Sequence, residues 1–229
     1  MKRRQTLTDV TAVLLCGALL FTVAFGVADR RSATPTVSTP HVLIDVGHGG
    51  ADGGATAADG TMEKDLNLAV ARPLCDLLTV MGYTAEMTRT EDVMLSTEGA
   101  SLRERKVSDM RNRLQMVNNA DLTVSIHQNK FPQTQYHGAQ VFYSPNTEDS
   151  RVLAECVREK IVSLVQPDNK RELKRGESSV YLLHHAERPM ILVECGFLSN
   201  EEELALLKTA PYRQKLAFAV AAGTMTYIG

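Results

Sequence analysis

The chain has 229 residues, of which 44% are hydrophobic and 23% are charged. This composition is typical of an ordinary globular protein and supplies enough apolar side chains for one sizeable core. The formal net charge is −2, and no basic stripe is interleaved with aromatic residues, so we exclude nucleic acid as a partner.

The first 30 residues differ in character from the rest of the chain. Lys2, Arg3 and Arg4 precede an uncharged run at 10–28, which approaches the length of a bilayer span and also fits a secretory signal. We expect 1–30 to be an N-terminal signal or membrane anchor, with the anchor slightly favoured. Residues 31–40 are rich in Ser, Thr and Pro and predict an extended linker.

The remaining residues, 41–229, are predicted to form one catalytic domain in which strands and helices alternate. Apolar runs predict strands at 42–46, 84–88, 122–126, 139–143, 180–183 and 190–194. Helical periodicity appears at 63–81, 101–118, 149–165, 201–208 and 211–226. This alternation predicts an α/β fold with a twisted, mostly parallel sheet of about six strands and helices on both faces.

The helix predicted at 63–81 has one apolar face and one proline. The apolar face consists of Leu66, Val70, Leu74, Leu77, Leu78 and Met81. Pro73 lies inside the helix and is expected to kink or break it.

Three apolar segments end in residues that can bind a metal or transfer a proton. They are VLIDVGHGG at 42–50, LTVSIHQN at 122–129 and MILVECGF at 190–197. They place His48, His127 and Glu194 just past three predicted strands, and an open α/β sheet collects functional groups where its strands end. This convergence predicts an enzyme.

The residue types predict a catalytic zinc site with one Zn²⁺ per chain. Such a site takes three protein ligands of the His and carboxylate type and keeps a fourth position for water. His48 lies among glycines that permit a tight turn, and His127 ends its strand in the same way. Glu63 opens a helix after a glycine-rich loop and can supply the third ligand, although the helix dipole alone also favours a carboxylate there.

Glu194 ends an apolar strand, so burial should raise its pKa and suit it to general base catalysis. The alternative is a buried structural carboxylate paired with an arginine.

Other polar residues near these segments have ordinary explanations. Asp45 is expected either to orient a ligand histidine or to accept backbone hydrogen bonds at its strand end. Asn129 is a candidate for substrate binding, or for an αL turn. Four arginines of the helix at 101–118 are expected to form a solvated basic face, namely Arg103, Arg105, Arg111 and Arg113.

The motifs together resemble the zinc-dependent N-acetylmuramoyl-L-alanine amidases of the amidase-3 family. GHGG is followed by a Glu fifteen residues after its His, then by SIHxN and LVECGFLSN, in the order found in that family. The resemblance spans 41–229. It implies that His48, Glu63 and His127 are zinc ligands and that Glu194 is the catalytic glutamate. The segments SLRERKVSDMRNRLQMVNNADL and YLLHHAERP make the chain most similar to the germination-specific spore-cortex amidases.

The resemblance implies hydrolysis of the amide between N-acetylmuramic acid and L-alanine in peptidoglycan. Removal of stem peptides from spore cortex would precede muramic-δ-lactam formation by a separate deacetylase. A zinc peptidase that cleaves within the stem peptide and a non-catalytic peptidoglycan-binding protein are the alternatives. Besides peptidoglycan, we consider an accessory protein or lipoprotein as a partner, and we expect an extracytoplasmic, membrane-anchored location at the cell or forespore surface.

Overall fold

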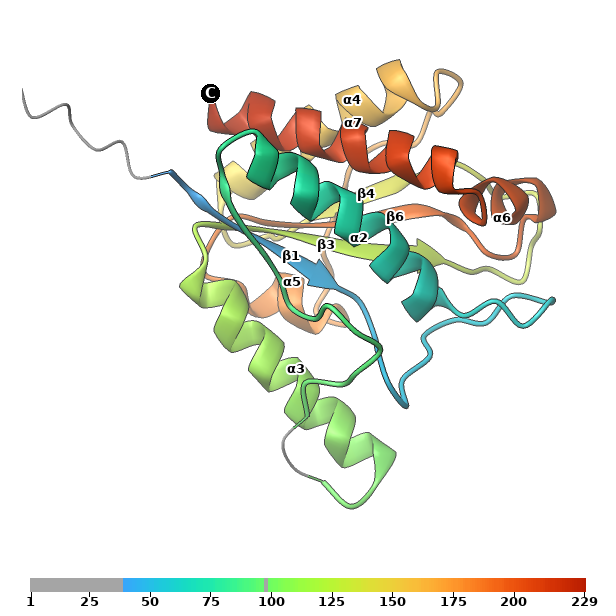
Figure 1. The fold of residues 1–229 in the computed structure, drawn as a ribbon, viewed down its shortest axis with the longest axis horizontal. Coiled ribbons are helices and arrows are strands. Elements are labelled where there is room, and N and C mark those ends of the chain that lie inside the picture. The colour runs from blue at the N-terminus through green and yellow to red at the C-terminus, as the bar shows by residue number, and fades with distance from the viewer. Residues whose placement is uncertain (1–38, 97–98) are drawn as a thin grey trace, which may run out of the picture. The chain divides into compact units, whose positions relative to one another are not determined.

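The computed structural model describes residues 39–96 and 99–229 (Figure 1). In chain order its elements are β1 (His41–Val46), α2 (Glu63–Val80), β2 (Thr84–Met87), α3 (Leu102–Asn119), β3 (Leu122–Asn129), β4 (Gln140–Tyr143), α4 (Glu148–Leu164), β5 (Lys174–Arg175), α5 (Tyr181–His185), β6 (Met190–Phe197), α6 (Glu201–Leu207) and α7 (Ala210–Ile228). Within these two ranges no helix is both long and apolar enough to cross a bilayer. The signal or anchor predicted at 1–30 lies outside the described residues, as does the predicted linker up to residue 38.

The strands form one six-stranded sheet in the order β2-β1-β3-β6-β4-β5. β1 pairs in parallel with β2 and β3, and β3 pairs in parallel with β6, whereas β4 runs antiparallel to β6. The predicted α/β fold with a mostly parallel sheet is therefore confirmed. Because β1, β3 and β6 run in the same direction, their carboxyl ends meet at one edge of the sheet.

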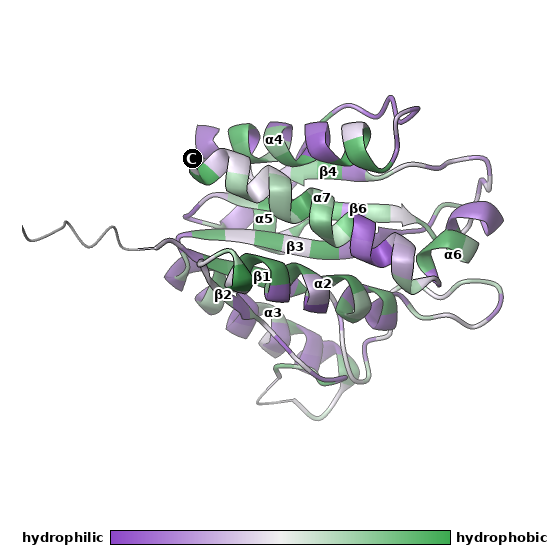
Figure 2. Ribbon diagram, turned by 45° about the horizontal axis from the view of Figure 1, so that its top comes forward, coloured by the Kyte–Doolittle hydropathy of each residue, from purple (hydrophilic) through white to green (hydrophobic). Residues whose placement is uncertain are grey.

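Helices cover both faces of the sheet, as predicted (Figure 1). α2, α4 and α7 pack together on one face, and α3 and α5 lie on the other. Successive residues of β1 alternate between the two cores, since Val42 and Ile44 face the α2 side and Leu43 faces the α3 side. Hydrophobic residues follow β1 and β3 between the layers, whereas α3 is largely hydrophilic (Figure 2).

Helix α2 has the predicted apolar face but is not broken by its proline. Leu66, Leu74 and Leu78 are buried, while Met81 follows the helix and is 59% exposed. α2 continues through Pro73, so the predicted break is wrong. A proline removes one backbone hydrogen bond, and burial of the apolar face of α2 offsets that loss.

The strand predicted at 180–183 is wrong. Tyr181–His185 form helix α5, whose Leu182 and Leu183 are buried in the core on the α3 side. Periodicity does not distinguish strand from helix in so short an apolar run, and β6 already has a neighbour on each side. The sixth strand is β5 instead, whose two charged, exposed residues carry no hydrophobic signal.

Strands β3 and β6 extend beyond their predicted ends, to Asn129 and Phe197. His127 and Glu194 therefore lie within strands rather than just past them, whereas His48 does follow β1. Backbone pairing between β3 and β6 continues through these polar positions, which hydrophobicity alone does not reveal.

Helices α4 and α7 pack closely at Gly223, which suggests a test of the helical layer. A Cβ at Gly223 would lie 2.4 Å from Val157 Cα and 2.8 Å from Val157 N, so an added methyl must separate the two backbones. We expect Gly223→Ala to lower the free energy of unfolding by about 1–3 kcal/mol, measured by urea denaturation. Lys215→Ala, exposed on the same helix, is the control, and equal stability of both variants would contradict the close packing.

Candidate functional site

His48 lies on the loop after β1 in a left-handed backbone conformation with φ of 62°. Its Nδ1 lies 2.9 Å from Asp52 Oδ2, and its Nε2 lies 3.2 Å from Glu63 Oε1. A carboxylate on one ring nitrogen fixes the tautomer and directs the other nitrogen toward a ligand. The Asp52 carboxylate therefore orients His48, whereas Asp45 pairs with Arg113 and Ser125 instead.

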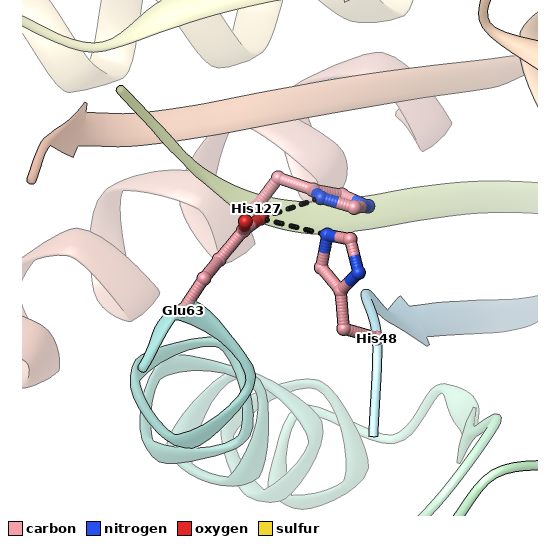
Figure 3. A group of neighbouring side chains, drawn as sticks. All are labelled: His48, Glu63 and His127. Carbon is pink, nitrogen blue, oxygen red and sulfur yellow. Dashed lines mark hydrogen bonds and ion pairs between the residues drawn. The ribbon is translucent and has the colours of Figure 1, made fainter. Parts of the chain in front are cut away.

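Glu63, the first residue of α2, joins the two histidines (Figure 3). Its Oε1 lies 2.8 Å from His127 Nδ1 as well as 3.2 Å from His48 Nε2. Its Oε2 accepts a hydrogen bond of 2.8 Å from the Ala55 amide. One donor atom from each of His48, Glu63 and His127 lies within 4.8 Å of the other two, so the structure brings together the three predicted ligands.

This donor set fits a divalent metal ion. Two imidazole nitrogens and one carboxylate oxygen converge from three different elements, which is the donor set of a catalytic zinc site with an open position. Burial lowers the pKa of His48, but the hydrogen bonds to Asp52 and Glu63 outweigh burial and raise it to about 9. Burial raises the pKa of Glu63, yet the two histidines hold it far below its ordinary value. Glu63 is therefore ionised, as a ligand must be, whereas His48 must release its proton when a metal ion binds.

Two glycines make room for these side chains. A Cβ at Gly47 would lie 2.3 Å from His127 Cε1. Gly54 has φ of 67°, and its Cβ would lie 2.6 Å from Glu63 Oε2 and 2.7 Å from His48 Cδ2. The glycines therefore allow the backbone to pass close to the three converging side chains.

Glu194 lies beside this group but is not one of its members. It is the register partner of His127 across β3 and β6, so both side chains project from the same face of the sheet. Burial raises the pKa of Glu194 to about 7. Its Oε2 is buried without a hydrogen-bond partner among the described residues, which leaves it available for proton transfer.

Two buried arginines hold the backbone of the His48 loop. Arg113 Nη2 donates to the His48 carbonyl at 2.8 Å and Arg89 Nε donates to it at 2.7 Å. Arg113 Nη1 also pairs with Asp45 Oδ1 at 2.6 Å, and Ser125 Oγ donates to Asp45 Oδ2 at 2.6 Å. The solvated face predicted for this arginine is wrong, because Arg113 is fully buried.

Sequence reasoning missed Asp52 and Arg89 as residues that support the site. Asp52 lies four residues after His48 in the same glycine-rich loop, and this spacing could have indicated it. Arg89 gave no local signal, because its partners are backbone carbonyls of 46–48 and 64.

Asn129 is the last residue of β3, and its hydrogen bonds go to residues other than His48, Glu63 and His127. Its Oδ1 accepts from the Lys130 amide at 2.8 Å and its carbonyl accepts from the Leu198 amide at 2.7 Å. Its role in substrate binding stays a prediction.

Comparison with known proteins gives matches over most of the chain. Residues 42–225 match the N-acetylmuramoyl-L-alanine amidase family. The germination-specific N-acetylmuramoyl-L-alanine amidase of Bacillus subtilis (strain 168) is 33% identical over 215 residues, which cover 91% of this chain and 90% of that protein. The N-acetylmuramoyl-L-alanine amidase LytC of the same strain is 28% identical over 188 residues, which cover 81% of this chain and 35% of LytC.

Solved structures share the same fold. The CwlD amidase from Clostridioides difficile, solved in complex with the GerS lipoprotein, superposes with a TM-score of 0.80 and 38% identity over 83% of this chain and 98% of that chain. The N-acetylmuramoyl-L-alanine amidase from Clostridium difficile 630 gives a TM-score of 0.73 and 30% identity over 83% of this chain and 97% of that chain.

The buried Glu194 carboxylate predicts a pH-dependent stability in metal-free protein. Below pH 4.5, its ordinary pKa, the carboxyl is protonated in both folded and unfolded chains and has no effect. Between pH 4.5 and about 7 the unfolded chain loses this proton first, so the folded state loses about 3 kcal/mol in total. We therefore expect Glu194→Gln to stabilise chelator-treated protein at pH 8 but not at pH 4, measured by urea denaturation.

The exposed Glu177→Gln is the matched control for this measurement. An equal gain at both pH values, or none at pH 8, would show that Glu194 is not held as an unpaired carboxylate.

Proposed function

The chain belongs to the N-acetylmuramoyl-L-alanine amidase family, and on this premise we propose that it is a zinc-dependent enzyme that removes stem peptides from spore-cortex peptidoglycan. As a member of this family it hydrolyses the amide between N-acetylmuramic acid and L-alanine in peptidoglycan. The observation that carries the zinc proposal is the convergence of His48, Glu63 and His127 on one point beside Glu194.

In this proposal His48, Glu63 and His127 would hold zinc, because one donor atom of each lies within 4.8 Å of the other two. Bound zinc would supply Lewis acidity to the scissile carbonyl and to the attacking water. Asp52 keeps a hydrogen-bond acceptor on His48 Nδ1, and Arg89 and Arg113 fix the carbonyl of the same residue. The protein therefore presents His48 in one orientation before metal binds.

Glu194 is proposed to move the proton. Its carboxylate accepts a proton from the attacking water, while the water oxygen bonds to the lactyl carbonyl carbon. It then delivers that proton to the nitrogen of L-alanine as the C–N bond breaks. The products are a free lactyl carboxyl group and a peptide with a free amino terminus. A pKa near neutrality suits one carboxyl to both transfers.

The germination-specific relative supports a role in the spore cortex. Stripped muramic acid would then pass to a separate deacetylase that forms the δ-lactam. The CwlD amidase, whose structure contains the GerS lipoprotein, supports an accessory lipoprotein as a partner of this chain. The apolar run at 10–28 supports export, with the catalytic domain anchored outside the cytoplasmic membrane.

Glu194 provides the first test of the proposed function. With zinc-loaded full-length protein and intact cortex peptidoglycan, we expect mass spectrometry to detect peptides that begin with free L-alanine. Glu194→Gln should bind zinc as the wild type does and lose roughly 100-fold or more in kcat, because the proton relay is absent. The exposed Glu177→Gln should retain full activity.

Full activity of Glu194→Gln would refute its proposed role. Fragments cut within the stem peptide, with muramic acid still substituted, would instead identify a peptidase. Equal release from cortex and vegetative peptidoglycan would count against a cortex-specific role.

Asp52 provides a test of the zinc site. We expect Asp52→Asn to weaken zinc binding by roughly 10- to 100-fold, since loss of an orienting carboxylate typically has this effect. Competition with a chromogenic chelator measures the affinity directly. Asp59→Asn removes an exposed carboxylate from the same loop, where it pairs with Lys208, and should bind zinc as the wild type does. Equal affinities in both variants would show that Asp52 does not orient His48.

A further inference from the structure

A β-bulge in β6 extends the face of the sheet that carries Glu194. His127 pairs with Glu194, and Asn129 pairs with Phe197, so two steps along β3 match three steps along β6. The extra residue reverses the alternation of side chains. Phe197 consequently projects from the same face as Glu194, one position further toward the carboxyl edge.

The guanidinium of Arg171 stacks against this aromatic side chain. It lies 4.5 Å from the centre of the Phe197 ring and 5.8 Å from that of Tyr136. Phe131 completes the cluster, with its ring 5.2 Å from Phe197 and 5.5 Å from Tyr136. Phe197 is fully buried, whereas Phe131 is 37% and Tyr136 41% exposed. The cluster therefore has a buried base and an accessible rim.

Several hydrogen bonds fix Arg171 in place. Its amide donates to Asn169 Oδ1 at 2.9 Å, and its carbonyl accepts from Arg158 Nε at 2.6 Å. Its own Nε donates to the His137 carbonyl at 2.7 Å. The guanidinium is thus held before any ligand arrives, which lowers the entropy cost of binding.

Arg171 lies close to the proposed reaction centre. Its Nη1 is 3.5 Å from Gln140 Oε1, and Gln140 is the register partner of Glu194 across β4 and β6. Two strand spacings, about 10 Å in total, separate β4 from β3 and its His127. An extended peptide covers that distance in about three residues.

Arg171 has no ion-pair partner in the part of the chain that the structure describes, unlike Arg113, which pairs with Asp45 and Asp109. Burial raises the pKa of Glu203, and the nearby charge of Arg171 opposes that rise. The Glu203 carboxylate accepts hydrogen bonds from the backbone amides of 138 and 197 rather than from Arg171. Packing against the Phe197 ring alone would not require a charged side chain. The planar fork of a guanidinium, by contrast, matches a carboxylate.

We propose that Arg171 binds a carboxylate of the stem peptide and so positions the substrate across the catalytic centre. This inference rests on the proposed amidase function. The lactyl carboxyl of muramic acid is consumed in the scissile amide, so the free carboxylates near that bond belong to the peptide. Its second and third residues both fall within the reach described above.

The test uses zinc-loaded full-length protein and three soluble muramoyl peptides, one with free carboxylates, one amidated at its second residue and one amidated at its third. On the free acid, Arg171→Gln should raise KM by at least about 10-fold, the effect of losing a charge-assisted contact, with little change in kcat. On the substrate whose amidation removes the bound carboxylate, Arg171→Gln should cause no further loss. Lys170→Gln, an exposed neighbour, is the matched control.

The outcomes distinguish a failure of carboxylate binding by Arg171 from a failure of the proposed amidase function. An equal loss by Arg171→Gln on all three substrates would overturn carboxylate binding and leave a structural role. If Arg171→Gln fails to fold, equal kcat/KM of the wild type on acid and amidated substrates would overturn it instead. If the wild type releases no peptide from any of the three, the proposed function itself fails.

Discussion

The buried pair between Asp45 and Arg113 is the interaction on which the site most depends. Asp45 lies on β1 and Arg113 on α3, so the buried pair ties a central strand to a helix. The same guanidinium reaches the carbonyl of His48. Removing Arg113 would leave the buried Asp45 carboxylate without its ion-pair partner, which typically costs about 3–5 kcal/mol. Fold stability and the position of a proposed ligand thus share one side chain.

The two carboxylates beside His127 have opposite environments. Glu63 is surrounded by hydrogen-bond donors and stays ionised, whereas Glu194 is buried with one oxygen unpartnered. The first environment suits a metal ligand and the second suits a proton carrier. The fold tolerates the less stable carboxylate because β6, which carries it, pairs with β3 on one side and with β4 on the other.

Sequence reasoning located His48 and His127 because parallel strands end at a common edge, and Glu63 because it opens a helix after a glycine-rich loop. The structure brings these three together. It misplaced Arg113, since a charged residue on a helix normally faces solvent and the buried partner on β1, Asp45, lies far away in the sequence. It also misassigned 180–183, where a short apolar run allows either a helix or a strand. The bulge that turns Phe197 toward the site depends on pairing between strands, which a single sequence does not encode locally.

The sheet also ends in strands that discourage growth. β5 consists of Lys174 and Arg175, both exposed, and β2 at the opposite edge has only four residues, with Glu86 exposed. Short, charged edges offer few free backbone groups and repel a second strand. A protein concentrated at a surface by a tether would meet copies of itself often. These edges therefore protect such a protein against edge-to-edge aggregation through strand pairing.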